Sequence, residues 1–438
     1  MESKSFPSVL VISPNSFNPY FGGGVTLTNL YKGWPKDKIA ILHSDTIPSD
    51  HSVCENEYRL ASAELEWKWP VSMLKRWQNS RKQGRDEQST SSGEIEQVVV
   101  GPSRIEKIQR FLIGDGLFHK AKISSRLEKW VLNFKPQLVY SLLGSIPFIR
   151  LTKGVAEMAG APIAIHMMDD WMETSYRRGV IAPYFRRQIL SEGQDIVSLA
   201  SLRMAISPSM AEAYGKRWGH PFVDFMNTID VASWERDSRK KWDKAAPFRV
   251  VYSGAIIANS ALEGIRDVCR AVAELHASGM KIEMALCCPD SFKNRYASEL
   301  ENHPSVKFHP PPEHETVASL FAGADLLVLP VNFDDDSIRY IRYSMPTKVP
   351  AYMCSGTPVL VYGPGEVASV QYAEREGWGY VVSEQGVDKL VDAIKVLAAD
   401  DELRKRLALR AKEVALKNHD AGHVRAAFRR ELAAAAGM

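Results

Sequence analysis

Three polar residues stand together at the end of an apolar stretch in the segment IAIHMMDDW. His166 belongs to the apolar run itself, and Asp169 and Asp170 follow it after two methionines. A histidine in such a place can donate a hydrogen bond or carry a proton near neutral pH, and a carboxylate can accept hydrogen bonds from hydroxyl groups. We therefore expect contact with a hydroxyl-rich ligand such as a sugar. The alternative is structural, with His166 satisfied in the core and Asp170 capping the next helix.

Cationic side chains form a second group in the segment FDDDSIRYIRYSMPTKVPAYM. Arg339 and Arg342 lead to Lys348, which stands just before a short helical pattern. A lysine near a helix start can meet a phosphate, because the ammonium and the helix dipole both attract an anion. The alternative is a solvated basic face. The three aspartates before Arg339 suit a polar loop better than a metal site.

A run of three glycines follows the first apolar stretch, in VLVISPNSFNPYFGGGVTLTNL. Gly22, Gly23 and Gly24 allow backbone amides to approach a ligand, and the helical pattern after them offers its positive dipole end to an anion. The segment is neither a P-loop nor a GxGxxG motif. A plain tight turn is the alternative to a ligand-binding loop.

All three groups lie on a regular alternation of short apolar runs and helical patterns, which is typical of βαβ units with parallel sheets. In the first half the expected strands are VLVIS, IAIL, LVYS, IAIHM, RMAIS and FVDFM. In the second half they are RVVYSG, KIEMALCC, VKFHP, DLLVLPV, PVLVYG and GYVVS. The polar segment 231–247 is predicted as a linker. We expect two doubly wound α/β domains that bind ligands at the carboxyl ends of their strands, with the cleft between them as the default site.

The composition narrows the class of protein. Hydrophobic residues make up 45% of the chain, charged residues 24%, and the formal net charge is +3, which is typical of a soluble globular protein and not of a nucleic-acid-binding polycation. The apolar runs are too short for a signal peptide or a membrane span, so we expect a cytoplasmic protein. The five cysteines lack zinc-like spacing, and His309 and His314 flank prolines without a cysteine partner, so no zinc site is predicted.

One segment, Lys75 to Ser92, interrupts the alternation with polar residues and is predicted as a surface insertion. Basic residues between Lys68 and Arg85 are interleaved with tryptophans. The alternative is therefore a peripheral contact with an anionic membrane at its inner face.

In their order along the chain, these segments resemble glycosyltransferases of the GT-B fold, and among them the retaining enzymes of glycosyltransferase family 4. YFGGGVTLTNL resembles their amino-terminal glycine loop, and IAIHMMDDW stands where they keep a sugar-contacting histidine. RMAISPSMAEAYGKRWG with FMNTID resembles their switch into the second domain, and RVVYSGAI, LFAGADLLVLPV and SGTPVLVYGPG resemble their donor-binding half. SMPTKVPAYM is similar to a branch found among exopolysaccharide and capsule enzymes.

The resemblance implies two Rossmann-like domains. Residues 1–232 would form the acceptor-side domain and residues 245–418 the donor-binding domain, with a helix over residues 419–438 returning to the first. The partners would be a nucleoside diphosphate sugar and a cell-surface polysaccharide or lipid-linked glycan, and neither a metal nor a cofactor would be required.

The resemblance also implies roles for single residues. Lys348 would neutralise the leaving phosphate, His166 would contact the transferred sugar, and Asp169 and Asp170 would line the sugar or acceptor site. The donor would be bound by a set that spans both halves: Gly22, Gly23, Gly24, Ser253, Gly254, Pro310, Glu313, Arg339, Arg342, Ser344, Thr347 and Lys348.

The chain departs from the family pattern at two places. The two glutamates that family members usually carry are replaced by Tyr343 and Ala351, and no cation precedes Arg266 in SGAIIANSALEGI. Two alternatives therefore stay open: a nucleotide-sugar epimerase of the same fold, and a non-catalytic GT-B module that binds a nucleotide-sugar.

Overall fold

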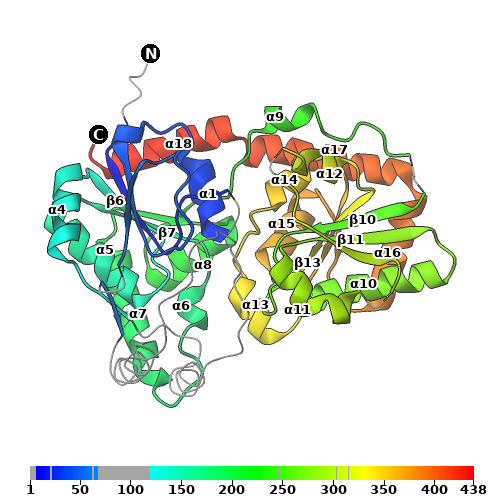
Figure 1. Cartoon of the computed structure of the whole chain (residues 1–438), viewed down its shortest axis with the longest axis horizontal. Coiled ribbons are helices and arrows are strands. Elements are labelled where there is room, and N and C mark those ends of the chain that lie inside the picture. Colours follow the sequence, from blue (N-terminus) through cyan, green and yellow to red (C-terminus); the bar gives the residue numbers. More distant parts are fainter. Residues whose placement is uncertain are drawn as a thin grey trace, which may run out of the picture. The chain divides into compact units, whose positions relative to one another are not determined.

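The structure, a computed structural model, describes residues 6–19, 22–61, 64–67, 119–243, 246–301, 303–313 and 315–438. The chain forms two compact units, one made of Met1–Asp224 with Ala427–Met438 and the other of Phe225–Ala426. Each unit has one main parallel sheet with helices on both faces (Figure 1). The predicted surface insertion from Lys75 to Ser92, the basic residues between Lys68 and Arg85, and His314 lie outside the described residues.

The first unit contains a seven-stranded parallel sheet in the order β3-β2-β1-β6-β7-β8-β9. Its strands are β1 (Val9–Ser13), β2 (Ile39–His43), β3 (Asn56–Arg59), β6 (Leu138–Ser141), β7 (Ile163–Met167), β8 (Leu202–Ala205) and β9 (Val223–Asp224). A separate antiparallel pair joins β4 (Leu65–Trp67) and β5 (His119–Ala121). The predicted strand FVDFM is reduced to the two residues of β9 at the sheet edge, and the polar edge strand β3 was not predicted.

Helices of the first unit follow the strands in regular alternation. They are α1 (Gly22–Tyr31), α4 (Ser125–Phe134), α5 (Ile146–Ala159), α6 (Trp171–Thr174), α7 (Ala182–Leu199), α8 (Pro208–Trp218) and the later part of α18 (Ala421–Ala435), with the short 3-10 helix η1 (Lys36–Lys38) before β2. Helix ends carry the usual capping residues, as α8 shows. The Ser207 hydroxyl caps α8 by accepting from Met210 N–H, and Gly219 ends the helix in the left-handed conformation.

The second unit contains a six-stranded parallel sheet in the order β12-β11-β10-β13-β14-β15. Its strands are β10 (Phe248–Ser253), β11 (Ile282–Cys287), β12 (Val306–His309), β13 (Leu326–Pro330), β14 (Val359–Tyr362) and β15 (Tyr380–Val382). Its helices are α9 (Val231–Glu235), α10 (Leu262–Ala277), α11 (Asp290–Leu300), α12 (Val317–Ala322), α13 (Asp335–Ile341), α14 (Val349–Cys354), α15 (Ala368–Glu376), α16 (Val387–Ala399), α17 (Asp401–Asn418) and the start of α18. All six strands of this sheet were predicted.

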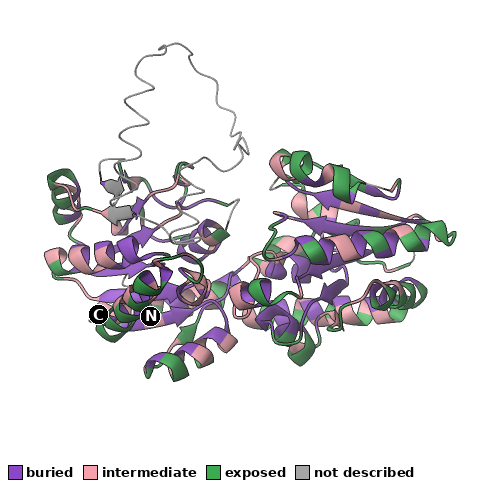
Figure 2. Cartoon of the chain, turned by 90° about the horizontal axis from the view of Figure 1, so that it is seen from below, coloured by how far each residue is buried: buried purple, intermediate pink, exposed green. Residues whose placement is uncertain are grey.

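Both sheets are buried between their helices, and their central strands are purple in Figure 2. Strands covered on both faces are apolar almost without interruption, as in β1, where every residue is buried. The strand order reverses between β1 and β6 in the first unit and between β10 and β13 in the second. Ligands of such sheets bind outside the carboxyl ends of the strands at these switch points.

The segment 236–243, which follows α9, is tied to the second unit by buried polar contacts. Arg239 donates from Nη2 to Asp325 Oδ1 at 2.7 Å, and its own N–H donates to the Ser355 carbonyl at 2.7 Å. The buried Arg404 guanidinium donates to the Trp242 carbonyl. No helix within the described ranges combines the length and the apolar character that crossing a bilayer requires.

Candidate functional site

The carboxyl end of β10 carries the arrangement best suited to anion binding in the second unit. Gly254 follows this strand at the switch point between β10 and β13, and the Nζ of Lys348 lies 4.0 Å from the centroid of the Tyr252 ring. A Cβ built on Gly254 would lie 2.7 Å from the same Nζ, and the φ of this glycine is 128°. The backbone approaches the ammonium so closely because residue 254 has no side chain.

Hydrogen bonds fix the backbone that carries Lys348. Helix α14 begins directly after it, and the Tyr352 hydroxyl of this helix accepts a hydrogen bond from Ser253 N–H at 3.0 Å. The carbonyl of the preceding residue, Thr347, accepts from Asn227 Nδ2 at 2.7 Å. A lysine stem is flexible, so these anchors and the Tyr252 ring together hold the ammonium at the end of β10.

The Lys348 ammonium has neither a hydrogen bond nor an ion pair with any residue that the structure describes. The residue is half-buried, and desolvation lowers the pKa of its ammonium from 10.5 to about 7. The cause is that the charged form loses water without gaining a counter-ion. A bound anion would supply that counter-ion, so the position favours a phosphate group.

The two predicted arginines are engaged elsewhere. Arg339 donates from Nη1 to Asp336 Oδ1 at 2.9 Å, and Arg342 donates from Nη2 to Glu366 Oε2 at 2.6 Å. Both pairs reach solvent, and such pairs contribute only about 0–1 kcal/mol, so a ligand could displace either partner at small cost. The structure brings Lys348, Ser253 and Gly254 together, whereas an assisting role for the arginines stays a prediction.

The amino terminus of α10 is the usual anion-binding element after the first strand of such a sheet. Here the buried Asn332 occupies it, because its Oδ1 accepts from the N–H groups of Glu263 at 2.9 Å and Gly264 at 3.3 Å. The Asn332 Nδ2 donates to the Ala258 carbonyl at 2.7 Å. Two amides that could hold a phosphate are thus already bonded, which leaves Lys348 as the strongest attraction for an anion at this strand end.

Three other donor residues that the sequence predicted in the second unit lie in its connecting segments. Pro310 and Glu313 are exposed in the loop after β12, and Ser344 lies half-buried between α13 and α14. Tyr343 and Ala351, which stand where the resemblance implies glutamates, are also half-buried. Contacts of these residues with a donor stay predictions.

His166 is the predicted sugar-contacting residue of the first unit. It is the fourth residue of β7 and is fully buried, and its Nδ1 lies 2.7 Å from the hydroxyl of Tyr140 on the neighbouring strand β6. Asp169 lies half-buried between the end of β7 and α6. Sequence reasoning did not single out Tyr140, although it stands in the predicted strand LVYS next to the strand of His166.

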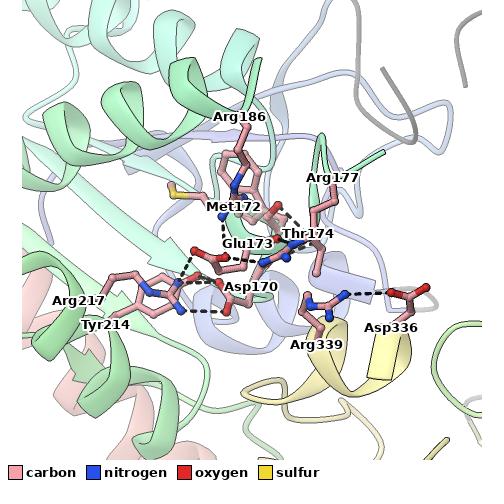
Figure 3. Close-up of polar contacts among 11 residues, drawn as sticks. Asp170, Met172, Glu173, Thr174, Arg177, Arg186, Tyr214, Arg217, Asp336 and Arg339 are labelled. Carbon is pink, nitrogen blue, oxygen red and sulfur yellow. Dashed lines mark hydrogen bonds and ion pairs between the residues drawn. The ribbon is translucent and has the colours of Figure 1, made fainter. Parts of the chain in front are cut away.

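Asp170 is held from α8 in a buried ion pair (Figure 3). Its Oδ1 accepts from the Tyr214 hydroxyl at 2.6 Å and from Arg217 Nη1 at 2.9 Å, and its Oδ2 accepts from Arg217 Nη2 at 3.3 Å. Asp170 begins α6, but its side chain makes no capping hydrogen bond. Both carboxylate oxygens therefore have protein partners, and a direct role of Asp170 at a ligand stays a prediction.

Glu173 continues the same network toward α7 (Figure 3). Its Oε2 accepts from Arg177 Nη2 at 2.9 Å and from Arg186 Nη2 at 2.6 Å. Burial alone would raise the pKa of Glu173, but the charges of Arg186 and Arg217 lower it. The segment after β7 is thus fixed by charged groups from α7 and α8 and by Arg177, which lies between α6 and α7.

The three glycines form the first turn of α1 at the switch point of the first sheet. A Cβ on Gly24 would lie 2.1 Å from Asn18 Nδ2 and 2.7 Å from the Ser16 carbonyl oxygen, and Gly22 has a φ of 52°. Packing against the preceding loop therefore accounts for Gly24. A contact between a diphosphate and Gly22, Gly23 or Gly24 stays a prediction.

The aspartates before Arg339 have structural partners. Asp334 caps α13 by accepting from Ser337 N–H at 2.9 Å, and Asp336 pairs with Arg339. Across the described ranges, no group of three or more His, Cys, Asp or Glu side chains is arranged to hold a metal ion. The expectation that the protein works without a metal stays a prediction.

Comparison with known proteins adds to this geometry. Residues 247–400 match the family model described as "Glycosyl transferases group 1". No curated protein matches the chain. The structure resembles HepE of Anabaena in complex with UDP and glucose, at 14% identity over 98% of this chain and 99% of that chain, with a TM-score of 0.61. It also resembles sucrose-phosphate synthase from Thermosynechococcus elongatus (15% identity, 98% and 100% coverage, TM-score 0.62) and the UDP-forming α,α-trehalose-phosphate synthase from Burkholderia vietnamiensis (11%, 97% and 99%, 0.60).

The protein has the GT-B fold. Likeness to the solved structures along almost the full length of each chain supports this fold, as the sequence predicted. The residues that match the glycosyltransferase model, 247–400, lie within the second unit and include Lys348 and Gly254.

Proposed function

We propose that the protein transfers a sugar from a nucleoside diphosphate sugar to a cell-surface polysaccharide or lipid-linked glycan, with retention of anomeric configuration and without a metal ion. The observation that carries the proposal is the Lys348 ammonium, which has no counter-ion among the described residues and lies at a strand switch point within the segment that matches the glycosyltransferase model. The resemblance to family 4 and its exopolysaccharide branch supports the finer assignment. We further propose that the protein acts in the cytoplasm, where nucleotide-sugars would reach it directly.

Sugar transfer requires one main contribution from the protein. When the bond between the sugar and the diphosphate breaks, negative charge grows on the leaving phosphate. A preplaced cation in a poorly solvated position stabilises this charge without reorganisation, and removal of one such donor typically lowers turnover by about 100- to 1000-fold. Lys348 is the residue that we assign to this role, and His166 is the one that we assign to the transferred sugar.

UDP is the first nucleotide to test, because the HepE structure was solved with UDP and with UDP-glucose. Binding to the native state raises the melting temperature by linkage. We expect the purified protein to be stabilised by one family of nucleoside diphosphates among UDP, GDP, ADP and dTDP, with and without magnesium. Stabilisation that requires magnesium would remove the metal-independent part of the proposal.

Turnover of the selected nucleotide-sugar then distinguishes transfer, epimerisation and binding without catalysis. Release of the nucleoside diphosphate that rises with added glycan acceptor supports transfer, whereas acceptor-independent isomerisation of the sugar supports an epimerase. Lys348→Met should lower turnover by at least about 100-fold, while the exposed control Lys395→Met should leave it unchanged. Nucleotide binding without any turnover would favour the non-catalytic module, an alternative that the residues at positions 343 and 351 support.

A further inference from the structure

A buried contact between two neighbouring strands of the first unit bears on the chemistry of His166. In the sheet register, Tyr140 of β6 pairs with Ala164 of β7, so Tyr140 and His166 project from the same face. The Tyr140 hydroxyl lies 2.7 Å from His166 Nδ1, and both residues are completely buried. At this distance the oxygen and the nitrogen are joined by a hydrogen bond, in which only one of the two groups donates.

The surroundings of Tyr140 decide which group donates. Its ring meets the edges of Tyr31 at 5.5 Å and of Phe428 at 5.9 Å between ring centroids. Burial raises the pKa of Tyr140 well above 10.0, so the hydroxyl keeps its proton. Within the described part of the chain, His166 Nδ1 is the only hydrogen-bond partner of this hydroxyl. If Nδ1 carried a proton, the Tyr140 O–H would be buried without an acceptor, which is costly.

We propose that Tyr140 is a positioning residue that holds His166 as a neutral imidazole with its proton on Nε2. In this form Nδ1 accepts from Tyr140 and Nε2 is a hydrogen-bond donor. Protonation to the imidazolium would make Nδ1 a second donor and would leave the Tyr140 O–H without an acceptor. The contact therefore also opposes the charged form of His166. The consequence for the reaction, which rests on the proposed function, is that His166 donates to an oxygen atom of the sugar and does not act as a general base.

Phe428 connects this contact to the carboxyl-terminal helix. It lies on α18, is fully buried, and packs against both Tyr31 and Tyr140. The helix thereby closes the apolar side of the Tyr140 ring. The hydroxyl of Tyr31 has no hydrogen-bond partner among the described residues, although it belongs to the same aromatic cluster. Tyr31 therefore offers a matched control.

The proton position can be measured directly by nitrogen-15 NMR on the full chain labelled at histidine. The chain has 11 histidines, and loss of one ring signal pair in His166→Gln assigns the resonances. Between about pH 6 and pH 8, where an ordinary histidine titrates, His166 should show a pyridine-type Nδ1 and a pyrrole-type Nε2 at every pH. Tyr140→Phe should abolish this fixed pattern, and Tyr31→Phe should retain it.

Two results would overturn the proposal. One is a pyrrole-type Nδ1 in the unaltered protein, and the other is an unchanged His166 spectrum in Tyr140→Phe. If Tyr140→Phe fails to fold, the spectrum of the unaltered protein still decides the position of the proton. Turnover of the donor provides a separate readout. Tyr140→Phe should lower kcat/KM by roughly tenfold, the amount expected from one misdirected hydrogen bond, and Tyr31→Phe should leave kcat/KM unchanged.

The spectroscopic and kinetic results can fail independently. A fixed Nε2 proton in a protein with no transfer activity would leave the tautomer in place and refute the proposed function. Transfer activity that is equal in Tyr140→Phe and Tyr31→Phe, together with a changed spectrum, would show that the tautomer has no consequence for the reaction.

Discussion

Lys348 should make nucleotide binding depend strongly on pH. Desolvation lowers the pKa of its ammonium to about 7, so above neutral pH most of the unliganded protein carries an uncharged Lys348. A diphosphate binds the ammonium and not the amine, because only the ammonium supplies a positive charge and a full set of donors. Binding therefore takes up a proton, and the affinity for the nucleotide should fall as the pH rises.

The magnitude follows from the pKa of about 7 in the unliganded protein. If the bound phosphates restore the pKa to its ordinary range near 10.4, each pH unit above 7 lowers the affinity by about tenfold, or about 1.4 kcal/mol. Between about pH 7 and pH 9 the terminal phosphate of UDP, with a second pKa of about 6, stays ionised. The ligand thus contributes little to the change in this window. Burial raises the pKa of the nearby Cys287 to about 11, so this thiol does not titrate there either.

Isothermal titration with UDP gives both the affinity and the proton uptake, when it is repeated in two buffers of different ionisation enthalpy. At about pH 8 a lysine with a pKa of about 7 is roughly one-tenth protonated, so binding should take up about 0.9 proton. Lys348→Arg keeps its charge throughout and should bind UDP with little dependence on pH. Lys348→Met should bind weakly and also without proton uptake. Uptake near zero in the unaltered protein, or equal uptake in Lys348→Met, would refute the reasoning.

Three further predictions concern stability. Arg239→Met removes one partner of a buried ion pair and should lower the free energy of unfolding in urea by about 3–5 kcal/mol, whereas Arg236→Met, at a side chain that is 87% exposed, should change it by less than about 0.5 kcal/mol. Gly24→Ala places a Cβ against neighbouring backbone and should lower the melting temperature, while Gly215→Ala in α8, where the Cβ has room, should raise it slightly. Burial lowers the pKa of His419 to about 4, below its unfolded value of about 6.5. Between these two pH values the unfolded chain binds more protons than the folded chain. The free energy of unfolding should therefore rise with pH across this window, by up to about 3 kcal/mol. Unfolding curves of His419→Gln should lose most of this slope, and an unchanged slope would contradict the assignment.

The sequence predicted the two-domain parallel architecture because buried parallel strands have a strong signature. Runs such as VLVIS and DLLVLPV are apolar on both faces and are separated by helical patterns of sufficient length for a crossover. The strands at the sheet edges were harder to predict. β3 reads NEYR, with only Tyr58 buried, so hydrophobicity does not mark it as a strand. β9 is shorter than predicted because the chain leaves the sheet after Asp224.

The candidate site was predictable only in part, because its decisive contacts join distant segments. Lys348 was singled out by its place before a helix, but nothing local indicates that it lies over Tyr252, which precedes it by almost a hundred residues. Asp170 attracted attention as a carboxylate at a strand end, yet its partners come from α8. Periodicity shows which positions are buried, but it does not show which buried polar groups meet.

The replacement of the usual glutamates has a specific consequence for recognition. Most of the charge of a nucleotide-sugar resides on its diphosphate, whereas the ribose and the transferred sugar are bound through neutral hydroxyl groups. Tyr343 and Ala351 cannot supply carboxylate acceptors for those hydroxyls, whereas the role proposed for Lys348 at the diphosphate does not depend on them. Affinity for UDP and selectivity among UDP-sugars should therefore depend on different residues. If Lys348→Met removes the affinity for UDP while the unaltered protein discriminates little among UDP-sugars, the two properties are separate. Strong discrimination in the unaltered protein would have to come from groups other than the residues at positions 343 and 351.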